Sequence, residues 1–181
     1  MATRGSYGFE MGGVIKATYN HFDSYPECLG KNLFTELQSI LRKPNATKIL
    51  RQAFLRIEMV SESDNVPIEV LELYARKRWI KITEQGITKN WNWYNFLHDW
   101  QGTMLPYIEY EDPYMIDVSE FDSDCLEYEY LVDLDNESFV SRECCEEGIV
   151  FALSFDDVKN SSETDYARLW SLMEDYKERI W

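Results

Sequence analysis

The spacing of apolar residues changes from a helical period to a two-residue period along this chain of 181 residues. Between residues 33 and 57 the apolar side chains recur every three or four positions, whereas from Leu126 to Leu134 they occupy alternate positions. A helix places residues i, i+3 and i+4 on one face, and a strand places alternate residues on one face. The chain is therefore limited to a fold that combines helices with a sheet.

The first half is expected to contain a hairpin followed by helices. Two short runs of aromatic and β-branched residues flank Gly12-Gly13, which predicts a hairpin with a two-residue turn. Helices are predicted at 33–41, 49–57, 67–76 and 90–101. In the third of these helices, Ile68, Val70 and Leu71 are expected to point inward.

The second half is expected to be mainly β structure. From 126 to 135 the residues alternate so that a strand would have one apolar and one mostly acidic face. Further strands are predicted at 138–142 and 148–155, and Ser161 or Ser162 can cap a final helix. We therefore expect a single α+β domain over residues 1–181 with a mostly antiparallel sheet. Its parts are a helical middle at about 31–101, an acidic β-rich part at about 104–155 and a C-terminal helix at about 163–181.

Acidic residues outnumber basic residues by 33 to 18, which gives a formal net charge of −15. The imbalance is confined to one half, because residues 1–100 carry a net +2 and residues 101–181 carry a net −17. Proteins that bind nucleic acids or anionic membranes use Lys and Arg for the purpose. The charge therefore argues against both as general ligands.

The densest acidic stretch runs from 107 to 147 and holds fifteen carboxylates against Arg142. Interleaved apolar residues indicate that it is folded, so its charges are held close together against their repulsion. Such an array can imitate the phosphates of a nucleic acid and bind a basic nucleic-acid-binding protein. The residues expected to bind this partner are Asp117, Glu120, Asp122, Asp124, Glu127, Glu129, Asp133, Asp135 and Glu137. The alternatives are a solvated face and a metal site at Asp133 and Asp135, for which the spacing of a calcium loop is missing.

A second cluster lies near the N-terminus and contains Arg4, Tyr19, His21 and Asp23. An imidazole, a carboxylate and a guanidinium within one turn region are the groups that metal-free cleavage of an RNA phosphodiester requires. The alternative is a structural loop in which these side chains bond to the backbone.

A basic stretch with tryptophans follows the third predicted helix. Its cations are Arg76, Lys77, Arg78 and Lys81, with Trp79, Trp91 and Trp93 nearby. Phosphate pairing combined with base stacking is how single-stranded RNA is held, so a limited guide-RNA contact is one interpretation. The other is an exposed helix end that pairs with the acidic half of the chain while its tryptophans join the core.

The start of the chain resembles a group of small phage and mobile-element proteins. The matching residues are Thr3-Arg4, the loop Tyr19-x-His21-x-Asp23-x-Tyr25-Pro26 up to Gly30, and the later acidic strand Tyr130-Leu-Val-Asp133-Leu-Asp135. Together with size and acidity, the chain looks like an anti-CRISPR inhibitor of a type II RNA-guided nuclease. Phe22 and Ser24 stand where these relatives often have Trp and Gly, which implies that a ligand site in this loop differs from theirs.

The leading interpretation is thus a non-enzymatic inhibitor that binds a type II CRISPR effector, whose guide and target strands lie in a positively charged channel. The alternative is an RNA-directed enzyme or activator that shortens the guide RNA. Four cysteines without a Cys-x-x-Cys pair and two histidines support neither a disulfide framework nor a zinc site, and no cofactor is expected. The first residues lack an apolar signal region, so we expect a cytoplasmic protein without a membrane segment.

Overall fold

The computed structural model describes residues 3–79, 91–121, 126–144, 150–162, 165–168 and 170–171. Its strands are β1 (Gly5–Met11), β2 (Val14–Asn20), β3 (Glu58–Val60), β4 (Tyr114–Ile116), β5 (Tyr128–Asp133), β6 (Ser138–Glu143) and β7 (Val150–Ser154). Its α-helices are α1 (Lys31–Leu41), α2 (Ala46–Arg56), α3 (Ile68–Lys77), α5 (Trp93–Phe96), α6 (Leu105–Glu109) and α7 (Phe155–Asn160). A π-helical turn η1 (Pro26–Gly30) and two 3₁₀ turns, η2 (His98–Trp100) and η3 (Val118–Glu120), complete the elements.

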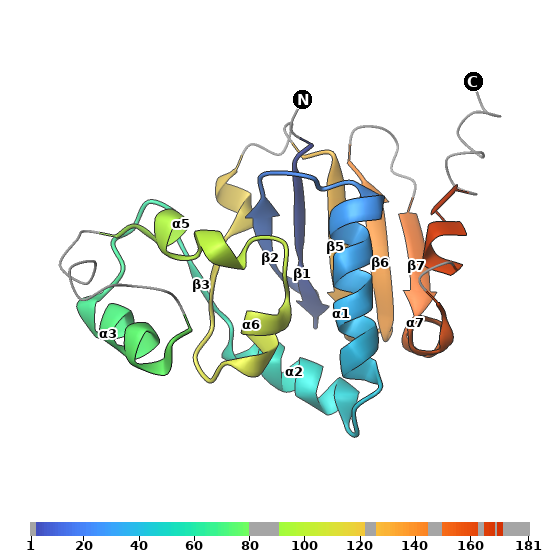
Figure 1. The fold of residues 1–181 in the computed structure, drawn as a ribbon, viewed down its shortest axis with the longest axis horizontal. Coiled ribbons are helices and arrows are strands. Elements are labelled where there is room, and N and C mark those ends of the chain that lie inside the picture. Colours follow the sequence, from blue (N-terminus) through green and yellow to red (C-terminus); the bar gives the residue numbers. More distant parts are fainter. Residues whose placement is uncertain are drawn as a thin grey trace.

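Five strands form the main sheet in the order β2-β1-β5-β6-β7 (Figure 1). The predicted hairpin is confirmed: Met11 pairs with Val14, and Gly12 and Gly13 turn the chain with φ of +62° and +73°. Only β1 and β5 run parallel, and every other pair in this sheet is antiparallel. The prediction of an α+β fold with a mostly antiparallel sheet is therefore confirmed.

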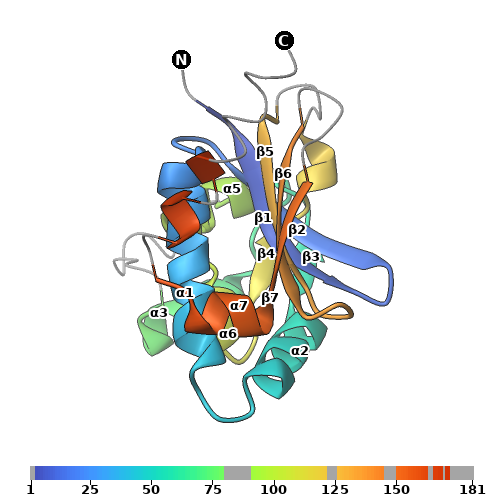
Figure 2. The ribbon, with the colours of Figure 1, turned by 90° about the vertical axis from the view of Figure 1, so that its right-hand side faces the viewer.

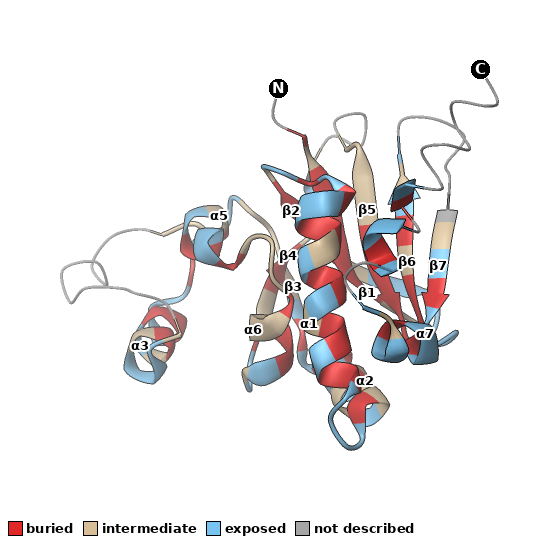
Figure 3. Ribbon diagram, turned by 45° about the vertical axis from the view of Figure 1, so that its right-hand side comes forward, coloured by how far each residue is buried: buried red, intermediate tan, exposed pale blue. Residues whose placement is uncertain are grey.

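The core lies between one face of this sheet and helices α1, α2 and α7 (Figures 1 and 3). From the sheet, fully buried rings of Tyr7, Phe9, Tyr130 and Phe139 contribute to it. From the helices come Leu33, Phe34, Leu37, Leu50 and Val158, all at most 1% exposed. Burial of large apolar side chains at about 1.5–3 kcal/mol each is the main force that holds these layers together.

Helices α1 and α2 follow the predicted apolar period closely. The prediction for α3 is correct in its bounds but wrong for Ile68, whose side chain is 55% exposed, while Tyr74 is fully buried in its place. Pro67 precedes the helix and Ile68 is its first residue, so the inward face starts two residues later at Val70.

A continuous helix over 90–101 is not formed in the described part of that range. Residues 93–96 make one short turn, capped by the Asn92 side chain, which accepts a hydrogen bond from Asn95 N at 3.0 Å. Residues 98–100 then tighten into η2 before Gly102, whose φ is +81°. The aromatic residues at helical spacing here pack into separate ring contacts, such as Trp93 with Tyr114 at 4.6 Å, and these contacts replace a single helical stripe.

The two-stranded parallel sheet of β3 and β4 was not expected from the sequence. Each strand has only three residues, which is too short for an alternating pattern to be recognised. With α3, α5 and α6, this small sheet builds a lobe beside β2 that is clearly visible in Figure 1.

The expectation of an acidic face along residues 126–135 is wrong in part. Leu131 and Asp133 share that face with Glu129, and they are 2% and 9% exposed. The reason is position in the sheet: β5 lies between β1 and β6, so neighbouring side chains cover it from both sides. The predicted buried strand at 148–155 is instead the edge strand β7, in which Ala152 and Ser154 are exposed.

The C-terminal helix is described only at its start. Residues 165–168 and 170–171 are helical, and Ser162 caps them, since Asp165 N donates to Ser162 Oγ at 3.2 Å. Residues 172–181, which the prediction also included, lie outside the described residues. Among the helices that are described, none combines the length and apolar character required to cross a bilayer.

Candidate functional site

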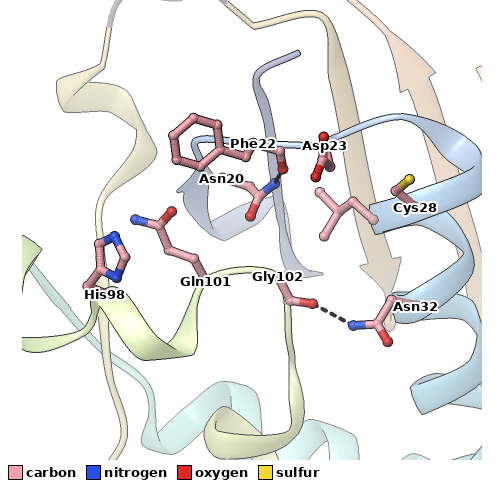
Figure 4. Close-up of a pocket in the computed structure, with 9 residues that line it drawn as sticks. Asn20, Phe22, Asp23, Cys28, Asn32, His98, Gln101 and Gly102 are labelled. Atoms are coloured by element: carbon pink, nitrogen blue, oxygen red, sulfur yellow. Dashed lines mark hydrogen bonds between the residues drawn. The ribbon is translucent and has the colours of Figure 1, made fainter. Parts of the chain in front are cut away.

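A surface pocket of about 350 Å³ opens where the loop after β2 meets the start of α1 and the turn around Gly102. Figure 4 shows its lining, which comes from three separate parts of the chain. The lining residues are Asn20, Phe22, Asp23, Cys28, Leu29, Asn32, His98, Gln101 and Gly102. The first six belong to the loop that the sequence singled out and to the helix that follows it.

Hydrogen bonds fix the loop that forms one wall. The buried Asn20 side chain donates to Phe22 O at 2.5 Å and to Ser24 Oγ at 2.9 Å. Ser24 N in turn donates to Thr3 O at 3.2 Å, and Leu29 N donates to Asp23 O at 3.2 Å. These bonds hold Asp23 in a left-handed conformation with φ of +52°. The loop is thus constrained from within before any ligand binds.

Two long-range hydrogen bonds join the segment around Gln101 and Gly102, which forms the other wall of the pocket, to this loop and to α1. Asn32 Nδ2 donates to Gly102 O at 2.6 Å, and the dashed line in Figure 4 marks this contact. His21 N donates to Gln101 Oε1 at 3.3 Å. Because these pairs are separated by 70 and 80 residues, the pocket exists only in the folded chain.

Several side chains of the pocket are left without polar partners in the described chain. The Asp23 carboxylate and the Cys28 thiol are exposed and form no side-chain hydrogen bond there. His98 has only a 4.0 Å approach to Asp99 and an edge contact with Tyr94. Cys28 and His98 stand at opposite ends of the pocket (Figure 4), so they do not form the thiol–imidazole pair that nucleophilic catalysis requires.

The predicted N-terminal cluster is only partly assembled. Tyr19 Oη and His21 Nδ1 are 3.0 Å apart, while the Tyr19 ring stacks on Phe121 at 4.4 Å and is 7% exposed. Asp23 faces the pocket, and Arg4 binds Glu127 through its backbone N–H at 3.4 Å. The contacts therefore join two of the four residues and do not bring the guanidinium to the imidazole.

His98, Gln101 and Asn32 line this site but were not expected there from the sequence. Both His98 and Gln101 fall within the helix predicted at 90–101, and no local pattern marks either of them as part of a site. Only the fold brings the second histidine of the chain to the loop that holds the first. The sequence did indicate the loop after β2 as a candidate site, through its Asn, Asp and Pro residues.

The acidic residues proposed to bind a partner are mostly engaged within the protein. Asp133 accepts hydrogen bonds from Asp135 N at 3.0 Å and from Asn136 N at 2.9 Å, and it closes the turn between β5 and β6. Asp135 accepts from Gly12 N at 2.6 Å, which ties this turn to the hairpin turn. Burial opposes ionisation of Asp133, but its hydrogen bonds from Asn136 and Asp135 outweigh that effect and lower its pKa. These carboxylates therefore act as structural acceptors.

The same holds at the start of the acidic stretch. Asp117 caps η3 by accepting from Ser119 N at 2.8 Å, and Glu120 accepts from Glu62 N at 2.9 Å. Glu127 accepts from Arg4 N. Glu137 is exposed at the turn before β6, and Asp122 and Asp124 lie outside the described residues.

Glu129 lies on the side of the sheet opposite the core, which we call the outer face. Strand register and alternation place on it Ser6, Gly8, Glu10, Ile15, Ala17, Tyr19, Glu129, Leu131, Asp133, Ser138, Val140, Arg142, Ala152 and Ser154. In Figure 2, α1 and α7 lie on one side of β5, β6 and β7, and the outer face of these strands points away from both helices. Burial raises the pKa of Glu129, the ion pair with Arg142 at 2.9 Å opposes that rise, and Glu10 adds to it.

The basic stretch is exposed at the end of α3, but two of its three tryptophans are packed within the protein. Trp79 stacks on Tyr110 with ring centroids 4.4 Å apart, and Trp93 is 3% exposed. Lys77 Nζ lies 3.2 Å from Glu111 Oε2, so one of the cations pairs with the acidic half of the chain. Arg76 and Arg78 are exposed, and Lys81 lies outside the described residues.

Within the described residues, no three His, Cys, Asp or Glu side chains are grouped so that they could hold a metal ion. Comparisons with family models, with curated proteins and with solved structures each gave no match. The function is therefore inferred from the residues of this chain.

Proposed function

We propose that the protein is a non-catalytic binding protein that engages a basic surface of another protein through its outer face. The observation that carries this proposal is the placement of Glu10 and Glu129 on the same face of the neighbouring strands β1 and β5, where Glu10 lies directly opposite Asp133. The negative charge of Glu10 also contributes to the raised pKa of Glu129. Carboxylates that repel each other on one face of a sheet are stabilised when a partner supplies a cation.

The surroundings of this pair also fit an interface. Ile15 is 48% exposed, Ala152 is exposed and Val140 is half-buried, so apolar surface lies beside the charges. Protein interfaces commonly combine an apolar centre with a polar rim. Arg142 is the one basic residue among the members of the outer face, and its pairing with Glu129 leaves Glu10 for the partner.

The partner that the resemblance implies is a type II CRISPR effector. Its guide and target strands occupy a positively charged channel, and carboxylates on a folded scaffold can compete for those cations. A chain with a net charge of −15 also approaches a basic protein faster, because electrostatic steering raises the association rate. Inhibition by occupation of the channel would follow from such binding without any chemical step.

The test is a DNA-cleavage assay with a purified, guide-loaded type II effector and increasing amounts of the protein. We expect the wild type to inhibit cleavage. Glu10→Lys should lower the inhibitory potency at least about tenfold, because a lysine placed opposite a cation of the partner costs more than about 1.4 kcal/mol of binding free energy. Glu72→Lys is the matched control, since Glu72 is exposed on α3 and the substitution changes the net charge equally. Equal losses in both variants would contradict the outer-face model.

Glu10 is a better target than the acidic turn. Reversing Asp133 would remove the hydrogen bonds that close the turn, so loss of inhibition there would also follow from unfolding. Circular dichroism of Glu10→Lys confirms that the fold is kept before potency is compared.

A gel of the guide RNA after incubation separates this proposal from the RNA-directed alternative. Intact guide RNA together with inhibition supports the binding protein, whereas a shortened guide supports cleavage and contradicts it. If the guide is shortened, His21→Ala tests whether the chemistry belongs to this protein, because Tyr19 and His21 are the two members of the N-terminal cluster that are in contact.

A further inference from the structure

We propose that the pocket between the β2–α1 loop and Gly102 binds a guanine ring, which stacks on Phe22 and donates two hydrogen bonds to the Asp23 carboxylate. This site lies at the end of the loop after β2 and is separate from Glu10 and Glu129. The proposal is independent of the partner proposed above.

Phe22 is placed so that a planar ring can stack on it. The residue is 57% exposed although it lines the pocket, and its ring rests edge-on against His21 with centroids 4.2 Å apart. The His21 contact covers one part of the ring and holds its orientation, so the rest of the ring remains available. A fixed, exposed aromatic ring beside polar groups is the platform on which proteins stack bases.

The pocket lining favours a ligand that donates hydrogen bonds. Among the nine lining residues there is no Lys or Arg, and His98 is the only one that could carry a positive charge. Asp23 carries a carboxylate, which in ionised form only accepts hydrogen bonds. The pocket therefore selects a planar group with N–H donors and disfavours a phosphate.

The acceptors of the pocket match the donors of guanine. A carboxylate has two oxygens that can accept a parallel pair of N–H donors. Guanine presents such a pair at N1–H and the N2 amino group, with an O6 acceptor beside it. Gln101 Oε1 is occupied by His21 N, which leaves the Gln101 amide N–H groups as donors for O6. In Figure 4 the Gln101 amide lies below and to the left of the Phe22 ring, and Asp23 lies to the right of the ring.

The volume of the pocket and the hydrogen bonds that fix its walls support a single nucleoside as the ligand. A volume of about 350 Å³ is at the lower end of small-molecule pockets, which span roughly 300–1,000 Å³. The walls are held by the Asn20 and Asn32 side-chain bonds, so little ordering is needed when the ligand enters. The guanine can come from a free nucleoside or from single-stranded RNA, and the net charge of −15 favours the uncharged nucleoside.

Isothermal titration calorimetry with guanosine, adenosine, guanosine monophosphate and a G-containing RNA pentamer tests the proposal. We expect guanosine to bind, adenosine to bind at least about tenfold more weakly because its N1 lone pair would face Asp23, and the monophosphate to bind more weakly than guanosine. Binding of the pentamer alone would assign the base to RNA. Absence of binding by all four probes at millimolar concentration would overturn the proposal.

Two variants locate the binding. Phe22→Ala and Asp23→Asn are each expected to weaken guanosine binding at least about tenfold, and Asn tolerates the positive φ of residue 23, so the loop is kept. The matched controls are Tyr25→Ala and Glu27→Gln, which remove an exposed ring and an exposed charge from the same segment outside the pocket lining. Guanosine binding that survives both pocket variants, or that falls equally in the controls, would also overturn the proposal.

Discussion

Asp133 ends β5 and Asp23 lies in the loop after β2, and the fold uses these two carboxylates in opposite ways. Asp133 is 9% exposed and accepts three hydrogen bonds within its own turn, whereas Asp23 is exposed at the mouth of a pocket and its carboxylate has no partner in the described chain. Asp133 lies in the densest acidic stretch of the sequence, and Asp23 has no acidic neighbour within three residues. Local charge density therefore does not identify the carboxylates that are free to bind.

The largest expected effect comes from exchanging each of these residues for its amide. Asp133→Asn places an amide N–H₂ group among donors that need acceptors, so the free energy of unfolding should fall by about 2 kcal/mol. Asp23→Asn should change it by less than about 0.5 kcal/mol, because no internal bond of the Asp23 side chain is lost. Urea unfolding at pH 7 measures both, and equal losses would show that the comparison is wrong.

The pH dependence of Asp133 offers a second check. Its pKa is lowered below the ordinary value of 3.8, so its contribution to stability is present above that pH and is lost as the pH falls through the lowered pKa. The difference in the free energy of unfolding between the wild type and Asp133→Asn should therefore become smaller below pH 3.8. A difference that stays constant down to pH 2 would show that the hydrogen bonds do not depend on ionisation.

Glu129 is intermediate between the two cases, because it is half-buried and paired with Arg142. Arg142→Ala removes the cation that is paired with this carboxylate, on which the negative charge of Glu10 also acts. We expect the free energy of unfolding at pH 7 to fall by about 1 kcal/mol, since Arg142 is 46% exposed and its attraction is screened. The pKa of Glu129 is raised, so the folded form holds its proton more tightly and stability falls as the pH rises above 4.5.

The fall in stability with rising pH should become steeper in Arg142→Ala and disappear in the double variant Arg142→Ala/Glu129→Gln. Thermal unfolding between pH 4 and pH 8 measures the slope. The same slope in all three proteins would mean that Glu129 does not titrate in this range.

The smallest effect is expected for the surface pair Lys77 and Glu111. Both side chains are well exposed, and exposed ion pairs contribute little to stability. Lys77→Ala should lower the free energy of unfolding by less than about 0.5 kcal/mol. A loss above 1 kcal/mol would mean that the basic stretch has a structural role larger than its exposure indicates.

The main elements of the fold could be predicted because their signals are local. Gly12-Gly13 adopts positive φ at little cost, and α1 and α2 repeat their apolar residues over three turns. The strands β3 and β4 were not predictable, since three residues carry no usable period. The spacing of the aromatic residues at 91–100 is compatible with a helix. Their rings instead pack against residues of distant segments, as Trp93 does against Tyr114, and the local spacing does not predict such contacts.

By itself, the sequence determined the α+β composition, the hairpin, the long helices and the excess of negative charge, because each depends on residues close together in the chain. Only the tertiary structure decided which charges are free. The parallel pairing of β1 with β5 places Glu10 beside the buried Asp133, on the face that also carries Glu129, and the docking of residues 98–102 on the β2 loop creates the pocket. Burial and hydrogen bonding depend on which segments meet, and no local pattern contains that information.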